Sequence, residues 1–79
     1  METRTFLADI EHLHGMLHWI REEAAKMSFV SVDLYKIELA SEEALVNVIH
    51  HSYEDMGGSV SISISSEYKL LKIIMEQSW

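Results

Sequence analysis

The sequence contains no cysteine and no proline, and only three of its 79 residues are glycine. The absence of cysteine excludes disulfide frameworks and thiolate zinc sites, and it is compatible with a reducing compartment. Basic residues are also scarce, because six Lys and Arg stand against thirteen Asp and Glu, which gives a formal charge of −7. Nucleic-acid backbones are bound by clustered basic side chains, so this charge balance argues against DNA or RNA as a partner.

Long hydrophobic runs are missing as well. Asn47 and Lys72 interrupt the two richest apolar segments, so nothing approaches the ~18 residues of a membrane span. The opening residues 1–5 do not lead into the apolar core of a signal peptide. We therefore expect a cytoplasmic protein with no membrane contact. The 48% hydrophobic content is that of an ordinary globular chain, and its length allows one small domain with a marginal core.

Hydrophobic spacing predicts a strand, two helices and two further strands. The three strands are expected over residues 3–7, 59–65 and 68–75, and the two helices over residues 9–27 and 32–54. A turn signal, Asp55-Met56-Gly57-Gly58, separates the second helix from the second strand. This order predicts an α+β fold: a two-layer sandwich in which two helices pack on one face of an antiparallel or mixed sheet.

The pattern within each element predicts which side is buried. Asp9 is expected to cap the first helix, and its buried stripe is expected to consist of Ile10, Leu13, Leu17, Ile20, Ala24 and Met27. The charged side of that helix, including Glu23, is expected to face water. The second helix has apolar residues over more than half its circumference, Ala40 and Ala44 among them, which predicts burial on two sides. The strand over 59–65 alternates serine with Val or Ile, whereas the mixed apolar strand over 68–75 is expected to be buried more deeply.

A polar line along the second helix is the main candidate for chemistry. Its members recur at intervals of three, four and seven residues: Lys36, Glu43, Asn47, His50 and Glu54. A carboxylate and an amide oxygen four residues apart point the same way, which suits Mg²⁺ with substrate phosphates, and the carboxylate could also orient or deprotonate a nucleophile. The ordinary alternative is the solvated edge of an amphipathic helix. Spacing by itself leaves both readings open.

Two other groups of residues carry weaker signals. His14, His18 and Glu22 have a helical spacing that zinc or nickel can use, although exposed histidines near glutamates are usually just solvated. Trp19 is either part of the core or an anchor for a partner, and Trp79 is either frayed or docked.

The segment over residues 38–53 resembles the N-box helix of RsbW-type anti-sigma factors. These are serine kinases of the histidine-kinase-like (GHKL) ATPase superfamily, whose pattern is approximately L-A-x-x-E-A-x-x-N-x-x-x-H-A-Y. The matching positions here are Leu39, Ala40, Glu43, Ala44, Asn47, His51 and Tyr53, with Ser52 at the place of the small residue. Residues 5–26 resemble the family's first strand and first helix, and the Gly-Gly turn with two strands resembles the family's next segment after the N-box.

The resemblance implies a partial Bergerat fold and assigns roles to residues. Glu43 would be the catalytic base or water-orienting group, and Asn47 would bind the Mg²⁺ that bridges the phosphates of ATP. His51 and Tyr53 would lie near the nucleotide. An intact protein would bind a sigma factor and phosphorylate an anti-anti-sigma (STAS) protein on serine, which would make it a regulator of transcription, and such proteins are typically homodimers.

The resemblance covers the family's N-terminal half. After the third strand the family has an Asp-x-Gly-x-Gly-like segment that recognises adenine, followed by an ATP lid, whereas this chain reads Glu76-Gln77-Ser78-Trp79. We therefore expect a single incomplete domain over residues 1–79. The alternative function is a nucleotide-free protein-interaction module on the same scaffold, so enzymatic activity is left open. An open edge on the last strand predicts a homodimer or a swapped oligomer.

Overall fold

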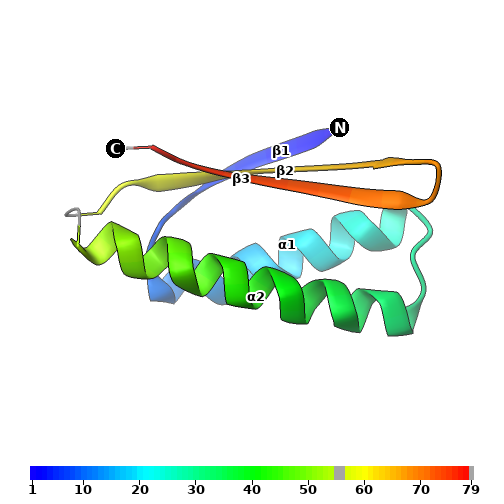
Figure 1. The fold of residues 1–79 in the computed structure, drawn as a ribbon, viewed down its shortest axis with the longest axis horizontal. Coiled ribbons are helices and arrows are strands. Elements are labelled where there is room, and N and C mark those ends of the chain that lie inside the picture. Colours follow the sequence, from blue (N-terminus) through cyan, green and yellow to red (C-terminus); the bar gives the residue numbers. More distant parts are fainter. Residues whose placement is uncertain (55–56, 79) are drawn as a thin grey trace.

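The computed structural model describes residues 1–54 and 57–78, without the side chains of Tyr53 and Glu54. Part of the expected turn, Asp55 and Met56, and the terminal Trp79 therefore lie outside the described residues. The elements in chain order are β1 (Glu2–Leu7), the short 3-10 helix η1 (Ile10–His12), α1 (Leu13–Lys26), α2 (Ser31–Glu54), β2 (Ser59–Glu67) and β3 (Leu70–Ser78). Both long helices lie on one side of the sheet (Figure 1). The expected α+β class is confirmed.

The sheet has the order β1-β2-β3 and is antiparallel throughout. Its register places Val60 opposite Phe6 and Gln77, and Ile62 opposite Met75. Residues that lie opposite one another share a face, so these side chains point toward the helices. The other face carries hydroxyl groups that hydrogen-bond across strands in the pairs Thr3–Ser63, Thr5–Ser61 and Ser59–Ser78, at 2.9–3.0 Å.

The core lies between β2 and the two helices. Its largest fully buried apolar side chains come from all three elements: Met16, Ile20, Leu45, Val60, Ile62 and Ile64. Phe6 of β1 and Trp19 of α1 extend it with an edge-to-face contact at 6.3 Å between ring centroids. Trp19 is therefore part of the packing around the core, which is the first of its two expected roles.

Three details of α1 differ from the expected stripe. Ile10 is exposed, because Asp9 caps the 3-10 turn of η1 and the α-helix begins only at Leu13. Met16, which the stripe omits, is fully buried. Glu23 is also buried, contrary to its expected place on the solvated side, and it accepts a hydrogen bond from Nζ of Lys26 at 3.2 Å. A cation at the rim thus compensates the burial of this carboxylate.

The hairpin between β2 and β3 turns two residues later than expected. Tyr68 and Lys69 both have positive φ, 52° and 65°, and β3 begins at Leu70 rather than at residue 68. Positive φ at both central residues is the backbone of a two-residue type I′ turn, whose twist matches that of the flanking strands. The turn type is thus adopted without the Asn or Gly that usually signals it.

Two of the burial predictions are wrong. β3 is not the more deeply buried strand: its residues alternate between exposed and half-buried, whereas three side chains of β2 are fully buried. Among the described residues, β2 is flanked by a strand on each side and β3 only on one. α2 is buried on one side, since Ala40 and Ala44 are exposed. No helix in the described part of the chain is long and apolar enough to cross a membrane.

Candidate functional site

The candidate site lies on the side of α2 that faces β3. The buried side of α2 carries Leu34, Leu45 and Ile49. Ala40 and Ala44 lie on a neighbouring side, and they line a groove of about 310 Å³ together with Ser41, Ile73 and Met75. The floor of this groove is therefore formed by apolar side chains of the outermost strand, and one wall is formed by the helix.

Glu43 and Asn47 adjoin this groove. Each lies three residues after one of the groove-lining alanines, and side chains three residues apart are neighbours on a helix surface. The two also lie four residues apart, about 40° around the helix axis, so their oxygens point in similar directions. Both side chains are exposed. The predicted pair is therefore accessible on the exposed side of α2, next to the alanines that line the groove, although neither residue lines it.

The other two predicted site residues fall near the C-terminal end of α2. His51 is exposed and lies seven residues after Ala44, on the same side of the helix as the groove. Tyr53 is within α2, but its side chain lies outside the described residues. The structure thus groups Glu43, Asn47 and His51 along one side of α2, and it leaves the predicted role of Tyr53 as a prediction.

A hydrogen bond that the sequence did not suggest fixes the spacing between α2 and β3. Nε2 of Gln77 donates to the hydroxyl of Ser52, which is fully buried. Nearby, the N–H of Gly57 bonds to the carbonyl of Ser52, and Gly57 and Gly58 have φ of 97° and 128°. These positive values are readily available only to glycine, so the Gly-Gly pair lets the chain turn back directly into β2.

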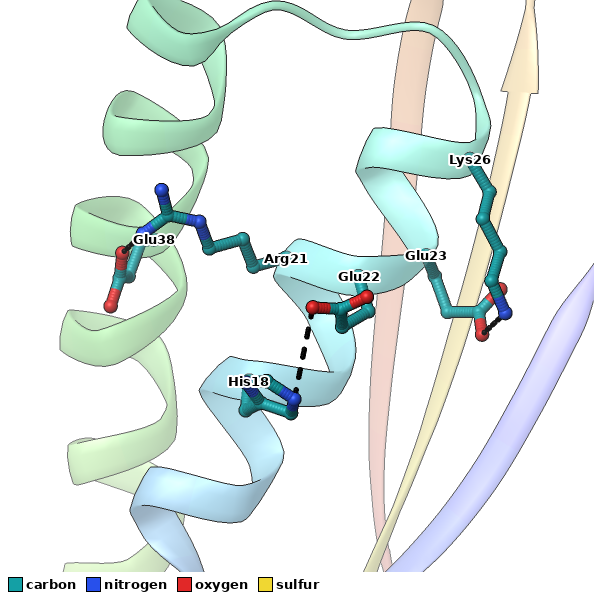
Figure 2. A network of polar contacts seen from close by, with 6 residues as sticks. All are labelled: His18, Arg21, Glu22, Glu23, Lys26 and Glu38. Atoms are coloured by element: carbon teal, nitrogen blue, oxygen red, sulfur yellow. Dashed lines mark hydrogen bonds and ion pairs between the residues drawn. The ribbon is translucent and has the colours of Figure 1, made fainter.

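The two helices are held together at the opposite side of α2. Arg21 of α1 donates to the carboxylate of Glu38 at 3.3 Å, as Figure 2 shows, while Glu23 and Lys26 lie on the other side of α1, toward the sheet. This partly exposed contact links α2 to α1 on a side of the helix that does not line the groove. The wall of the candidate site is held against the rest of the fold mainly by the buried residues of α2, Leu34 and Leu45 among them.

A comparison with known protein families identifies the family to which this fold belongs. A family model described as the histidine kinase-like ATPase domain matches residues 6–76, which include the end of β1, both long helices, β2 and most of β3. The chain belongs to the histidine kinase-like ATPase family. No curated protein gives a significant match.

Membership in the histidine kinase-like ATPase family raises the question of whether the described residues fit ATP and Mg²⁺. Asn47 and Glu43 supply the amide and carboxylate oxygens that Mg²⁺ prefers, and both are accessible. Ile73 and Met75 supply an apolar floor of the kind that holds a planar base. The residues that line the groove include no cationic side chain to hold phosphates. These residues therefore fit a metal ion and a planar adenine ring better than they fit the phosphates of ATP.

The histidines of α1 form a separate and simpler arrangement. Nε2 of His18 lies 3.8 Å from the carboxylate of Glu22, and both side chains are more than half exposed. Among residues 1–54 and 57–78, no group of three or more potential ligands is arranged to hold a metal ion. The expected spacing of His14, His18 and Glu22 thus corresponds to an exposed contact on a helix surface.

Proposed function

We propose that this histidine kinase-like ATPase domain contributes the Mg²⁺ side of an ATP site in a protein serine kinase of the anti-sigma type. The observation that carries the proposal is the position of Glu43 and Asn47 beside the groove between α2 and β3. The spacing of residues 39–53, which resembles the N-box of RsbW-type kinases, supports the finer assignment. The family match supports nucleotide binding in general.

In this proposal each residue has a distinct task. Bound Mg²⁺ supplies charge neutralisation on the phosphates during transfer. The amide oxygen of Asn47 acts as a metal ligand, and the carboxylate of Glu43 accepts the proton of the attacking serine hydroxyl or orients it. His51 lies further along the same side of α2 and contacts the nucleotide. Tyr53 is proposed to contribute to the same end of the site.

The proposed partners derive from the resemblance. The protein would bind a sigma factor in the cytoplasm and phosphorylate an anti-anti-sigma protein of the STAS class on serine. The charge of −7 is compatible with protein partners and unfavourable for nucleic acid, so control of transcription would act through the sigma factor rather than through DNA.

Isothermal titration of the chain with ATP and Mg²⁺ tests the proposal. We expect heat of binding in the unaltered chain and at least tenfold weaker binding in Asn47→Ala, which removes the metal ligand. Glu42→Gln is the matched control for Glu43→Gln, because Glu42 is also exposed but points about 100° away from Glu43 around the helix axis. Glu43→Gln should bind ATP as the control does and transfer phosphate to a STAS substrate about 100-fold more slowly. Heat that is unchanged in Asn47→Ala would contradict the assignment.

A nucleotide-free protein-interaction module is the second candidate. It is favoured by the absence of a cationic side chain among the residues that line the groove. In the same titration this candidate predicts no heat with ATP, with or without Mg²⁺, in either the unaltered chain or the Asn47→Ala variant. Saturable heat that requires Mg²⁺ and Asn47 would exclude it.

A further inference from the structure

A polar pocket lies at the end of the fold where the connection between α1 and α2 meets the hairpin of β2 and β3. Figure 1 shows these two segments side by side, at the opposite end of the molecule from the C-terminal end of α2. The pocket has a volume of about 380 Å³, within the range of roughly 300–1,000 Å³ that is typical of small-molecule sites. This hairpin pocket is lined by residues of both segments: Met27, Ser28, Phe29, Asp33, Ser66 and Lys69.

Two opposite charges line the hairpin pocket from different elements. Asp33 lies in the first turn of α2, and Lys69 lies in the turn between β2 and β3. Both residues are exposed, and within the described part of the chain neither takes part in an ion pair. The carboxylate and the ammonium group therefore border one pocket without binding each other. Each is available to a group of opposite charge that is placed between them.

The backbone of the hairpin pocket is strained in two places. Ser28 has a φ of 71° directly after the C-cap of α1, where its N–H bonds to the carbonyl of Ala25, and glycine usually occupies this position. Lys69 has a φ of 65° in a turn that favours asparagine or glycine. Glycine would relieve the strain at both positions, but it would remove two side chains from the pocket. Strained residues of this kind cluster at positions that hold ligands.

We propose that the hairpin pocket binds a free α-amino acid with an apolar side chain. At neutral pH such a molecule carries an ammonium and a carboxylate group on the same carbon atom. Its ammonium donates to the carboxylate of Asp33, and its carboxylate accepts hydrogen bonds from Nζ of Lys69 and the hydroxyl of Ser66. Its side chain packs against Met27 and Phe29, which are half-buried at the edge of the core. Hydrogen bonds between charged groups are about twice as strong as those between neutral groups.

The pair of opposite charges selects against ligands that carry only one charge. A small anion would be attracted by Lys69 but repelled by Asp33, and the net charge of −7 adds to the repulsion. A cation without an anionic group would be repelled by Lys69. An uncharged ligand would displace water from both charged side chains without pairing them, which costs free energy. A zwitterion is the class of molecule that pairs with both groups at once.

Titration with leucine, followed by the amide signals in two-dimensional NMR spectra, tests the proposal. We expect saturable shifts in residues 27–33 and 66–69. The dissociation constant should be in the millimolar range, because water competes for both exposed charges. N-acetyl-leucine lacks the ammonium group and leucinamide lacks the carboxylate, so each should bind at least about tenfold more weakly than leucine. If either derivative bound as tightly as leucine, the pocket would not be a zwitterion site.

Variants that remove one charge locate the site. Asp33→Asn and Lys69→Asn should each weaken leucine binding at least about tenfold. Asparagine tolerates the positive φ of residue 69, so the turn is kept, and circular dichroism verifies that both variants are folded. Glu67→Gln and Lys72→Gln are the matched controls, because these exposed residues line a separate pocket of the same hairpin. Each control should change the dissociation constant by less than about twofold.

Three results would overturn the proposal. The first is the absence of leucine-dependent shifts in residues 27–33 and 66–69. The second is unchanged binding in the folded Asp33→Asn or Lys69→Asn variant, and the third is a loss of binding in either control as large as in these variants. The titration contains no nucleotide and changes none of the residues of the proposed kinase site, so its outcome is separate from that of the ATP titration.

Discussion

Gln77, near the end of β3, donates a hydrogen bond from its side-chain amide to the hydroxyl of Ser52, which is fully buried in α2. This contact joins the C-terminal part of the helix to the last strand, the two elements between which the groove lies. Because buried polar groups are costly without a partner, the pair specifies the relative position of the two elements as well as stabilising them.

Replacement of either partner should therefore destabilise the fold. Gln77→Leu leaves the buried hydroxyl of Ser52 without its donor, and we expect a loss of about 1–2 kcal/mol in the free energy of unfolding. Ser52→Ala should cost a similar amount, whereas the double variant should cost less than the sum of the two. Urea unfolding of the four proteins measures the coupling energy. Strictly additive losses would mean that the two side chains act independently.

The parts of this fold that can be predicted from the sequence are those with a regular pattern of apolar and polar residues. The alternation of serine with Val60, Ile62 and Ile64 predicts a strand with one face in the core, and β2 is such a strand. The turn at Tyr68 and Lys69 was not predictable, because neither residue type favours positive φ. Only the pairing of β2 with β3 imposes that backbone on the two residues.

The candidate site likewise has one part that the sequence predicts and one part that it does not. Spacing and resemblance locate Glu43 and Asn47 on one helix, since helix geometry alone puts residues four apart on one side. The groove beside them was not predictable. It depends on Ile73 and Met75, which the register of the β2–β3 hairpin places on the helix side of the sheet, and on the packing of that sheet against α2, which the pattern within either element does not specify.

The acid sensitivity of the fold should depend on Asp9. A hydrogen bond from the side chain of His12 lowers the pKa of Asp9 from its ordinary value of 3.8. A carboxyl group with a lower pKa in the folded state contributes stability above its unfolded pKa, and this contribution is lost as the pH falls through the folded pKa.

Asp9→Asn keeps an oxygen that can cap η1 but removes the charge. The melting temperature of the variant should therefore be lower than that of the unaltered chain at neutral pH, and the two should converge as the pH falls below about 3.8. Thermal melts followed by circular dichroism over this pH range measure the difference. A gap that stays constant down to the lowest pH would contradict the role of the Asp9 carboxylate.

Two glycines should respond to the same substitution with opposite sign. Gly15 lies within α1, and an added Cβ meets nothing within 4 Å, so Gly15→Ala should stabilise the protein by about 0.5–1 kcal/mol. Gly57 also has open space around it, but its φ is +97°, and Gly57→Ala should destabilise by about 1–2 kcal/mol. Urea midpoints that move in the same direction for both variants would refute the backbone argument.

The fully buried Ile62 should be sensitive to the loss of a single methyl group. Ile62 lies on the central strand and faces the helices, so Ile62→Val leaves a small cavity and should lower stability by about 0.5–1.5 kcal/mol. Ile10→Val is the matched control, because Ile10 is 54% exposed and the same deletion there should change stability by less than about 0.5 kcal/mol. Paired thermal melts compare the two variants. An equal drop in melting temperature would mean that burial in the sheet does not determine the cost, since the two substitutions remove the same atoms and differ in their surroundings.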